Sequence, residues 1–295
     1  MPVVFVGVAM LDVIALVDAF PPADGRVPAQ EVVHAGGGPA ATAAVTAARL
    51  GVDDVRFVGT VGDDEHGRRI VDQLVAESVD VSGVRVDAHP SGVSVAIVDR
   101  GQGTRALCAR PGPPLDLTGT QQQFVRTADW VHVDHLGWAP VAGTLSAQAS
   151  PPPLSVDEGN PIPDFTPRDV DLYVPTVEVL AHRYGELPVD ELLTAARTEG
   201  ARTIVATLGS SGSVAATASG ERVTAPPLDV DPYSTLGAGD VFHGAVVTAA
   251  LRDQPIDHCL AYANVVAGLS CRGLDGRSAI PTHEEACRVL RQHRS

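Results

Sequence analysis

The sequence contains no lysine, so all 21 of its basic residues are arginines. Biased codon usage is the simplest cause, but the chemical consequence is the same whatever the cause. Schiff-base catalysis, pyridoxal-phosphate anchoring and the Walker P-loop all depend on a lysine amine. These three kinds of site are therefore excluded.

Cysteines and long apolar runs are also scarce. Four cysteines are scattered without a CxxC spacing, which predicts reduced core residues in a cytoplasmic protein rather than a disulfide framework or a zinc site. Residues 1–20 are apolar but lack a basic region and are interrupted by Asp12 and Asp18, so we expect no signal peptide. No run approaches the roughly 18 apolar residues of a membrane span.

Positive charge is in the minority. The formal net charge is −15, which argues against nucleic acid or an acidic membrane surface as a partner, because both carry dense negative charge. Small anions remain possible ligands, since they respond to local fields.

Apolar strand-like runs alternate with helical patterns along the chain. Strands are expected at 3–9, 55–62 and 202–209, and helices at 38–51, 67–78 and 188–199. This alternation predicts an α/β fold with a mostly parallel sheet and helices on both faces. No boundary suggests a second domain, so we expect one domain over residues 1–295, with ligands bound beyond the carboxyl ends of the strands.

Two regions break the alternation, at about 13–34 and 91–110. The second region alternates apolar residues on both sides of an "RGQG" turn, as a β-hairpin does. We expect these segments to form a small β-sheet lid beside the main sheet.

The stretch "DPYSTLGAGDVFHGA" (231–245) combines glycines, a carboxylate and the start of a helix expected at about 239–251. Glycines let backbone amides approach a ligand, and the positive end of the helix points to the same place. Asp240 would repel a static anion there, but it could take a proton from a hydroxyl group while the amides stabilise a transferring phosphoryl group. An ordinary turn with a first-turn acid explains this motif alone equally well.

Three other features are ambiguous by themselves. Asp12 follows a buried strand and could hold sugar hydroxyls, although a turn aspartate is the simpler interpretation. "HAGGGPAATAA" (34–44) could approach a polyol or be a tight strand-to-helix turn. "ATLGSSGSVA" (206–215) could line nucleotide phosphates or form a Gly-Ser hairpin.

His132, Asp134 and His135 lie on one expected strand, with His132 and Asp134 on the same face. A metal site would need a third ligand. We therefore interpret these residues as strand-end polarity near the substrate.

Taken together and in this order, the motifs resemble the ribokinase-like (PfkB) family of carbohydrate kinases. The resemblance runs from Asp12 through "GGGPAATAAVTAARLG", "GTVGDDEHG", "VATLGSSG" and "STLGAGDVFHGA" to "GRSAIPTHEE". Among its branches, the motifs are most similar to those of the sulfofructose kinases.

The resemblance implies a three-layer α/β/α domain with a β-lid, and phosphorylation of a sugar hydroxyl by ATP with Mg²⁺. It implies that Asp240 is the general base and that Gly237, Ala238 and Gly239 form the anion hole. It also implies a homodimer formed through the lid. Sugar contacts are implied for Asp12, Gly37 and Gly38, and nucleotide contacts for Thr207, Gly209, Gly212 and, near the adenine, Asn264.

The sequence departs from the family pattern at several positions. Ser234 replaces an aspartate associated with monovalent-cation activation, and Thr42 replaces a common asparagine that contacts the sugar. The family's Asn-x-x-Glu magnesium motif falls on Thr176 and Val179, which leaves the metal ligands unknown. Of the positions at which sulfofructose kinases bind the sulfonate group of their substrate, only Arg26 keeps a basic residue here.

The acceptor stays open at this point. Arg26, Arg105 and Arg110 allow an anionic sugar, such as sulfofructose or a sugar phosphate. A nucleoside is the other acceptor considered, and the aromatic content of only 4 % disfavours a base-stacking pocket. A non-catalytic protein that binds sugar or nucleotide is the alternative of another class; the altered magnesium motif favours it and the intact "GAGD" disfavours it.

Overall fold

The computed structural model describes residues 2–293. Its core is a nine-stranded sheet with the order β13-β12-β11-β10-β9-β8-β1-β4-β5, in which the seven strands from β11 to β5 are parallel. The hairpin strands β12 and β13 extend one end of the sheet by antiparallel pairing. The strand bounds are β1 Val3–Val6, β4 Val55–Gly62, β5 Asp80–Asp87, β8 Trp130–Val133, β9 Leu154–Glu158, β10 Leu172–Pro175, β11 Thr203–Thr207, β12 Ser213–Ala216 and β13 Arg222–Ala225.

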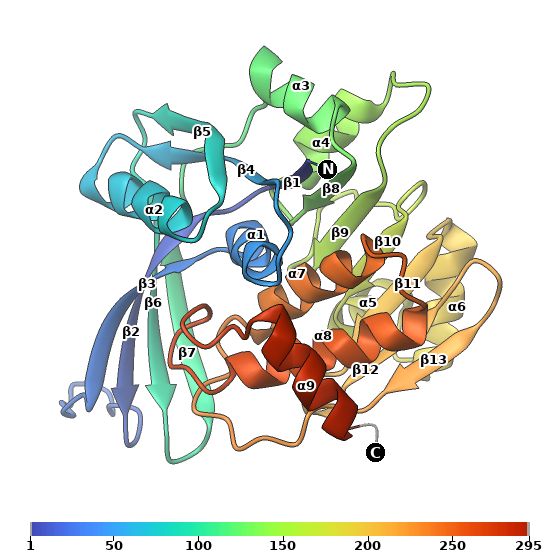
Figure 1. Cartoon of the computed structure of the whole chain (residues 1–295). Coiled ribbons are helices and arrows are strands. Elements are labelled where there is room, and N and C mark those ends of the chain that lie inside the picture. The colour runs from blue at the N-terminus through green and yellow to red at the C-terminus, as the bar shows by residue number, and fades with distance from the viewer. Residues whose placement is uncertain (1, 294–295) are drawn as a thin grey trace.

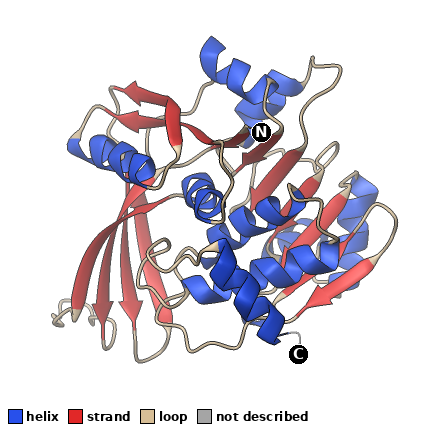
Figure 2. Cartoon of the chain, viewed as in Figure 1, coloured by secondary structure: helices blue, strands red, loops and turns tan. Residues whose placement is uncertain are grey.

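Helices cover both faces of this sheet, as Figures 1 and 2 show. One apolar cluster joins the sheet to α1 (Pro39–Arg49), α2 (Glu65–Ala76), α7 (Ala238–Ala250), α8 (Ile256–Ser270) and α9 (His283–His293). A second cluster joins the opposite face to α3 (Gly119–Arg126), α4 (Trp138–Leu145), α5 (Val177–Tyr184) and α6 (Val189–Glu199). The predicted three-layer α/β/α architecture is therefore confirmed.

Small residues allow α1 and α7 to pack closely. Helix α1 buries mainly alanines, and a Cβ atom at Gly244 of α7 would lie 2.5 Å from the carbonyl oxygen of Ala43. Because the two helices touch through backbone atoms, close packing constrains the position of α7 relative to the sheet.

A separate four-stranded sheet has the order β3-β2-β6-β7, with β2 Met10–Val17, β3 Glu31–Gly37, β6 Gly92–Asp99 and β7 Thr104–Arg110. In Figure 1 it extends away from the main sheet at the lower left, and it forms the small separate sheet expected from the sequence. Strands β2 and β3 reach closer to the main sheet than expected, because pairing continues to Met10↔Gly37. Asp12 and Gly37 therefore lie where the lid sheet joins the main domain.

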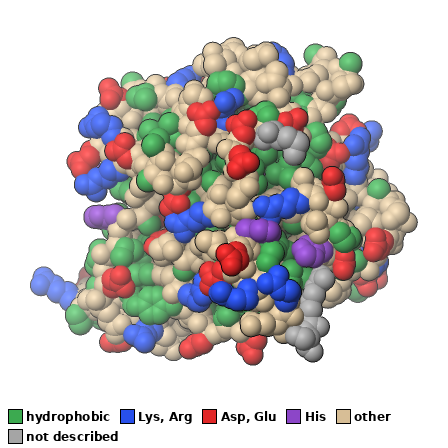
Figure 3. Space-filling view, viewed as in Figure 1, with side chains coloured by type: hydrophobic (Ala, Val, Ile, Leu, Met, Phe, Trp, Pro, Cys, Tyr) green, Lys and Arg blue, Asp and Glu red, His purple; other side chains and the backbone are tan. Residues whose placement is uncertain are grey.

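Figure 3 shows acidic and basic side chains interspersed over the face formed by α8 and α9. The four cysteines are free thiols. Among residues 2–293, none of the helices has the length and apolarity that crossing a membrane requires.

Candidate active site

The loop before α7 turns sharply at Gly237. Gly237 caps the helix with a φ of 74°, a left-handed conformation that favours glycine, and a Cβ atom there would lie 2.6 Å from the Cα atom of Gly276. The first turn then contains Ala238, Gly239 and Asp240. Its amide groups lie at the positive end of the helix, although the Ala238 amide also donates to the Thr235 carbonyl oxygen at 3.3 Å.

Asp240 occupies an environment that favours its protonated form. Burial, together with the nearby negative charge of Asp157, raises the pKa of the Asp240 carboxyl group to about 7, while His243 opposes that shift. A pKa near neutrality suits a group that must accept a proton from a hydroxyl group at physiological pH. The position and pKa of Asp240 are thus compatible with general-base chemistry.

Asp12 lies on β2 and is buried. The Ser94 hydroxyl donates to Asp12 Oδ1 at 2.6 Å. Burial raises the pKa of the Asp12 carboxyl group, and the Ser94 hydrogen bond and the Arg277 charge limit that rise. The absent side chain of Gly37 leaves room for the Asp12 carboxylate, and Gly38, with a φ of 94°, leaves room for the Val8 carbonyl oxygen. The close approaches at these two glycines are thus made to protein atoms.

Arg277, in the loop between α8 and α9, is a site residue that sequence reasoning missed. Its guanidinium group is buried and donates to Thr42 Oγ1 at 3.1 Å and to the Gly37 carbonyl oxygen at 2.9 Å. Burial lowers the pKa of Arg277 to about 10, and the charges of Asp12 and Asp240 oppose that shift. The "GRSAIP" motif contains this arginine, but the sequence could not show its partners because they lie 235 and 240 residues away along the chain.

Asp134, which the sequence placed at a strand end, accepts hydrogen bonds from backbone amides through its carboxylate. Its two oxygens accept hydrogen bonds from the amides of Val8, Ala40, Leu136 and Gly137. It therefore fixes the β1–β2 turn and the start of α1. His132, on β8, is buried beside Asp157 and His243, two residues that the sequence did not single out.

The expected nucleotide residues lie on the β11–β12 turn and on α8. Gly209 and Gly212 have φ values of 57° and 92°, so the turn after Thr207 requires both glycines. The side-chain amide of Asn264 donates to the carbonyl oxygens of Ala225 (3.0 Å) and Pro226 (2.9 Å). Asn264 therefore holds the loop after β13, and its contact with adenine stays a prediction.

The residues at the expected magnesium motif do not fit a metal ion. The Thr176 hydroxyl accepts the Val179 amide at 3.2 Å and caps α5, and the Val179 side chain is buried and apolar. Mg²⁺ prefers carboxylate and other oxygen ligands, which this pair does not offer.

The two lid arginines lie in different places. Arg105 on β7 donates to Thr235 Oγ1 at 2.8 Å and so connects the lid sheet to the loop before α7. Arg26 is exposed in the loop between β2 and β3. The structure thus brings Arg105, but not Arg26, into contact with the loop before α7, for which the sequence predicted an anion hole. The Ser234 hydroxyl, in that loop, accepts the Leu236 amide at 3.2 Å.

A cavity of about 230 Å³ lies elsewhere, and its lining residues are Ala249, Arg252, Gln254, His258, Tyr262, His283 and Cys287. It belongs to α7, α8, the loop between them, and α9, and contains none of the residues expected to bind sugar or nucleotide. The chemistry described above is concentrated at the carboxyl ends of the strands instead.

Comparison with known proteins identifies the family of this chain. Residues 2–151 and 160–283 match the model of the pfkB family of carbohydrate kinases, so the chain belongs to that family, as its motifs predicted. It is a sugar kinase by that membership.

Individual relatives extend the match along almost the whole chain. An ATP-dependent ribose-1-phosphate kinase of Halopiger xanaduensis is 30 % identical over 286 residues, 95 % of this chain and 94 % of its own length. The structure of Arabidopsis thaliana ribokinase complexed with ribose and ATP has a TM-score of 0.84 at 23 % identity, covering 98 % of both chains. An Escherichia coli protein solved with ATP and Mg²⁺ has a TM-score of 0.83 at 18 % identity, covering 99 % of both chains. These structural neighbours share the fold.

Proposed function

We propose that the protein transfers the γ-phosphoryl group of ATP to a hydroxyl group of a sugar, with Asp240 as the general base. The observation that carries this proposal is the carboxylate of Asp240, whose pKa is raised to about 7, in the first turn of a glycine-started helix. The ATP-dependent kinase of Halopiger xanaduensis, 30 % identical, supports ATP as the donor.

In the proposed step, the acceptor oxygen forms a bond to the γ-phosphorus as the bond from that phosphorus to the ADP oxygen breaks. Asp240 takes the hydroxyl proton, and the amides of Gly237, Ala238 and Gly239 stabilise the charge on the transferring group. Asp12 would orient the sugar through its hydroxyls. Mg²⁺, as bound with ATP in the Escherichia coli neighbour, would neutralise charge on the phosphates, and Thr176 and Val179 would not hold it.

We further propose an anionic sugar as the second candidate acceptor. The ribose-1-phosphate kinase relative favours a sugar phosphate, and Arg105 and Arg277 supply positive charge near the loop before α7 and near Asp12. Sulfofructose belongs to the same class of acceptor. The exposed Arg26 would contribute only if the loop between β2 and β3 folds over the sugar.

A homodimer formed through the lid is also proposed. The lid face that points away from its apolar cluster with Leu274 carries Val13, Ala15, Val32, Val95, Ile97 and Cys108. Val32 and Val95 are 59 % and 41 % exposed, which is unusual for valines on one face of a sheet. Covering this face with a second lid would bury them.

The test is an ADP-release screen with ATP and Mg²⁺ over pentoses, hexoses, phosphosugars, sulfofructose and nucleosides, followed by identification of the phosphorylated product. We expect sugar-dependent ADP release, and release that is faster with a phosphosugar or sulfosugar would select the anionic acceptor. Release only with nucleosides would replace the sugar by a nucleoside. Binding of sugar and ATP without any ADP release would support the non-catalytic binding protein and contradict the proposal.

A further inference from the structure

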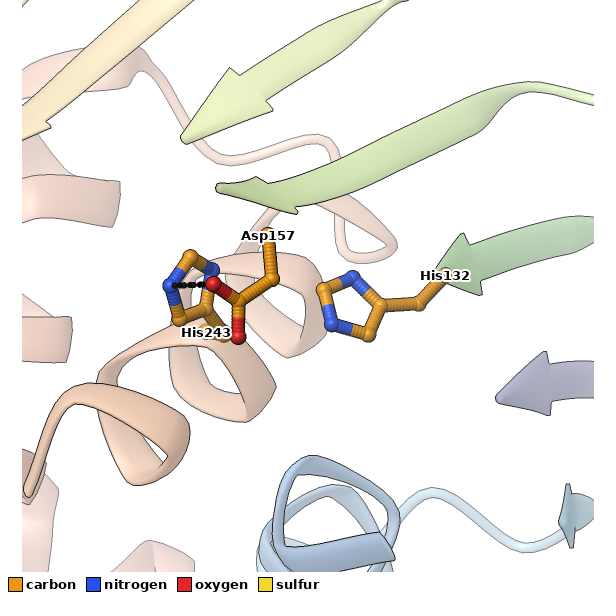
Figure 4. Close-up of side chains that lie close together, drawn as sticks. All are labelled: His132, Asp157 and His243. Carbon is orange, nitrogen blue, oxygen red and sulfur yellow. Dashed lines mark ion pairs between the residues drawn. The ribbon is translucent and has the colours of Figure 1, made fainter. Parts of the chain in front are cut away.

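Three side chains from distant segments meet in the interior beside the first turn of α7 (Figure 4). His132 comes from β8, Asp157 from β9 and His243 from α7, and they are only 0 %, 4 % and 4 % exposed. One nitrogen or oxygen atom from each lies within 4.8 Å of the other two. His243 Nε2 is 3.1 Å from Asp157 Oδ1. We call these three residues the His-Asp-His cluster.

Two imidazole nitrogens of the cluster lack a protein partner. His132 Nε2 and His243 Nδ1 are fully buried and have no hydrogen-bond partner among residues 2–293. Buried polar atoms in folded proteins are nearly always satisfied by protein, water or a bound ion. His132 Nε2 therefore points to a ligand, which His243 Nδ1 does not share because His243 faces Asp157 through its Nε2 atom.

Hydrogen bonds around His132 indicate which of its nitrogens carries a lone pair. Ser155 Oγ accepts the Trp130 indole N–H at 2.9 Å and lies 3.4 Å from the Val131 carbonyl oxygen, its acceptor. The remaining Ser155 contact, at 2.8 Å, is with His132 Nδ1, and the tautomer that satisfies all three Ser155 contacts is the one in which Nδ1 donates its proton. The lone pair is then on Nε2. Metal-binding histidines are oriented in this way by a partner on the other ring nitrogen.

We propose that His132, Asp157 and His243 bind one divalent transition-metal ion such as Zn²⁺. Two imidazoles and a carboxylate are a donor set that zinc accepts, and bonds of 2.0–2.1 Å in tetrahedral geometry separate neighbouring ligand atoms by about 3.3 Å. The His243–Asp157 spacing of 3.1 Å already matches this value. The ligand atom of His132 lies no more than 4.8 Å from those of the other two residues. A shift of about 1.5 Å at most would bring it to the zinc-ligand spacing.

The charges around the cluster favour a cation. The carboxylate of Asp134 interacts electrostatically with Asp157, and both of these groups interact with Asp240 above them. Asp12 also contributes negative charge at Asp240. The positive groups that oppose these carboxylates are Arg277, on the Asp12 side, and His243 and His135 when protonated. A divalent ion would offset the excess of negative charge.

The experiment measures metal directly and needs no catalytic turnover. The untagged full-length protein is incubated with Zn²⁺ or Co²⁺, freed of excess metal, and analysed by elemental mass spectrometry and, for Co²⁺, by visible absorption. We expect about one equivalent of metal and cobalt bands typical of nitrogen ligation. Asp157→Asn and His132→Asn should each lower the metal content at least tenfold, the loss expected for a missing ligand.

Two matched controls separate this site from other metal binding. His283→Asn removes an imidazole outside the cluster, and Asp240→Asn removes a carboxylate from the same edge of the sheet; both should keep the full equivalent. Equal loss in either control would overturn the proposal, as would less than about one-tenth equivalent in the wild type. The latter result would mean that His243 and Asp157 form only a hydrogen bond.

Circular dichroism and the thermal midpoint decide whether the ligand variants are folded. If they are not, the cobalt titration of the wild type still tests the proposal, because bands without nitrogen ligation would refute it. A failed sugar screen would leave this result unchanged, so the two proposals fail separately.

Discussion

Two groups of buried and half-buried acidic residues lie on adjacent parts of this molecule, and they are stabilised differently. In the first, Glu158 accepts the Tyr173 hydroxyl and lies 3.6 Å from Arg183, which also binds Glu199 through two hydrogen bonds of 3.0 and 3.1 Å. In the second, Asp157 and Asp12 repel the charge of Asp240, and the guanidinium group of Arg277, which interacts with Asp12 and Asp240, donates its hydrogen bonds to Thr42 and Gly37. The first group contacts its arginine directly, whereas Asp12 accepts the Ser94 hydroxyl, Asp157 pairs with His243, and the side-chain hydrogen bonds of Arg277 go to other groups.

The difference separates a structural network from the one that the proposed function would use. Arg183 and two tyrosines consume the acceptor capacity of Glu158 and Glu199, so little is left for a ligand. Asp240 instead keeps a raised pKa because desolvation disfavours its charged form and because Asp157 and other carboxylates repel its negative charge. Such electrostatic strain is typical of functional sites, and its cost in stability is offset by the rest of the fold.

The largest expected effect is on catalysis. Asp240→Asn keeps the shape of the side chain but removes the proton acceptor, so kcat should fall by roughly 10²–10⁴-fold. Steady-state ADP release with the best acceptor from the screen measures this. Near-wild-type kcat in the variant would remove Asp240 from the mechanism.

The matched change in the structural group should affect stability instead. Arg183→Met leaves Glu158, which is only 2 % exposed, without its positive partner. Because Arg183 is partly exposed, we expect a loss of roughly 2–4 kcal/mol in the free energy of unfolding, with kcat within about twofold of wild type. Urea denaturation and kcat measured on the same samples check both parts. A large loss of kcat with unchanged stability would reverse the assignment of the two groups.

The activity should also depend on pH through Asp240. Its pKa is raised to about 7, so the carboxylate is the major form only above that pH. Below pH 7 we expect kcat/KM to fall by about tenfold per pH unit as the base becomes protonated. A profile that stays flat down to pH 5 would show that the free enzyme keeps Asp240 ionised.

The smallest expected effect is a stability gain in the catalytic variant. Since the folded-state pKa of Asp240 lies above the ordinary aspartate value of 3.8, the folded protein binds this proton more tightly than the unfolded chain does. Stability from this group is therefore lost as pH rises from about 4 to about 7. Asp240→Asn should have a higher thermal midpoint than wild type at pH 8 and a similar one at pH 4. A lower midpoint at pH 8 would contradict the charge repulsion inferred here.

Much of the fold could be predicted because its signals are local. The periodic apolar residues of 67–78 and 188–199 and the apolar run at 55–62 each indicate one element, and α2, α6 and β4 lie there. Strand β5, with a burial pattern that does not alternate, was not anticipated, and the lid strand β2 begins three residues earlier than expected. The start of β2 depends on its pairing with β3, which is a contact between separate segments of the chain.

By itself, the sequence determined the family, the order of the elements, and the glycine-started turn that precedes Asp240. These depend on residue type and spacing along a short stretch of chain. Tertiary structure alone decided that Arg277 reaches Gly37 and Thr42, and that Asp157 and His243 join His132. The sequence interpretation lacked a third ligand for His132 because β8, β9 and α7 are distant in the chain. Their side chains meet only when the parallel strands and α7 pack together.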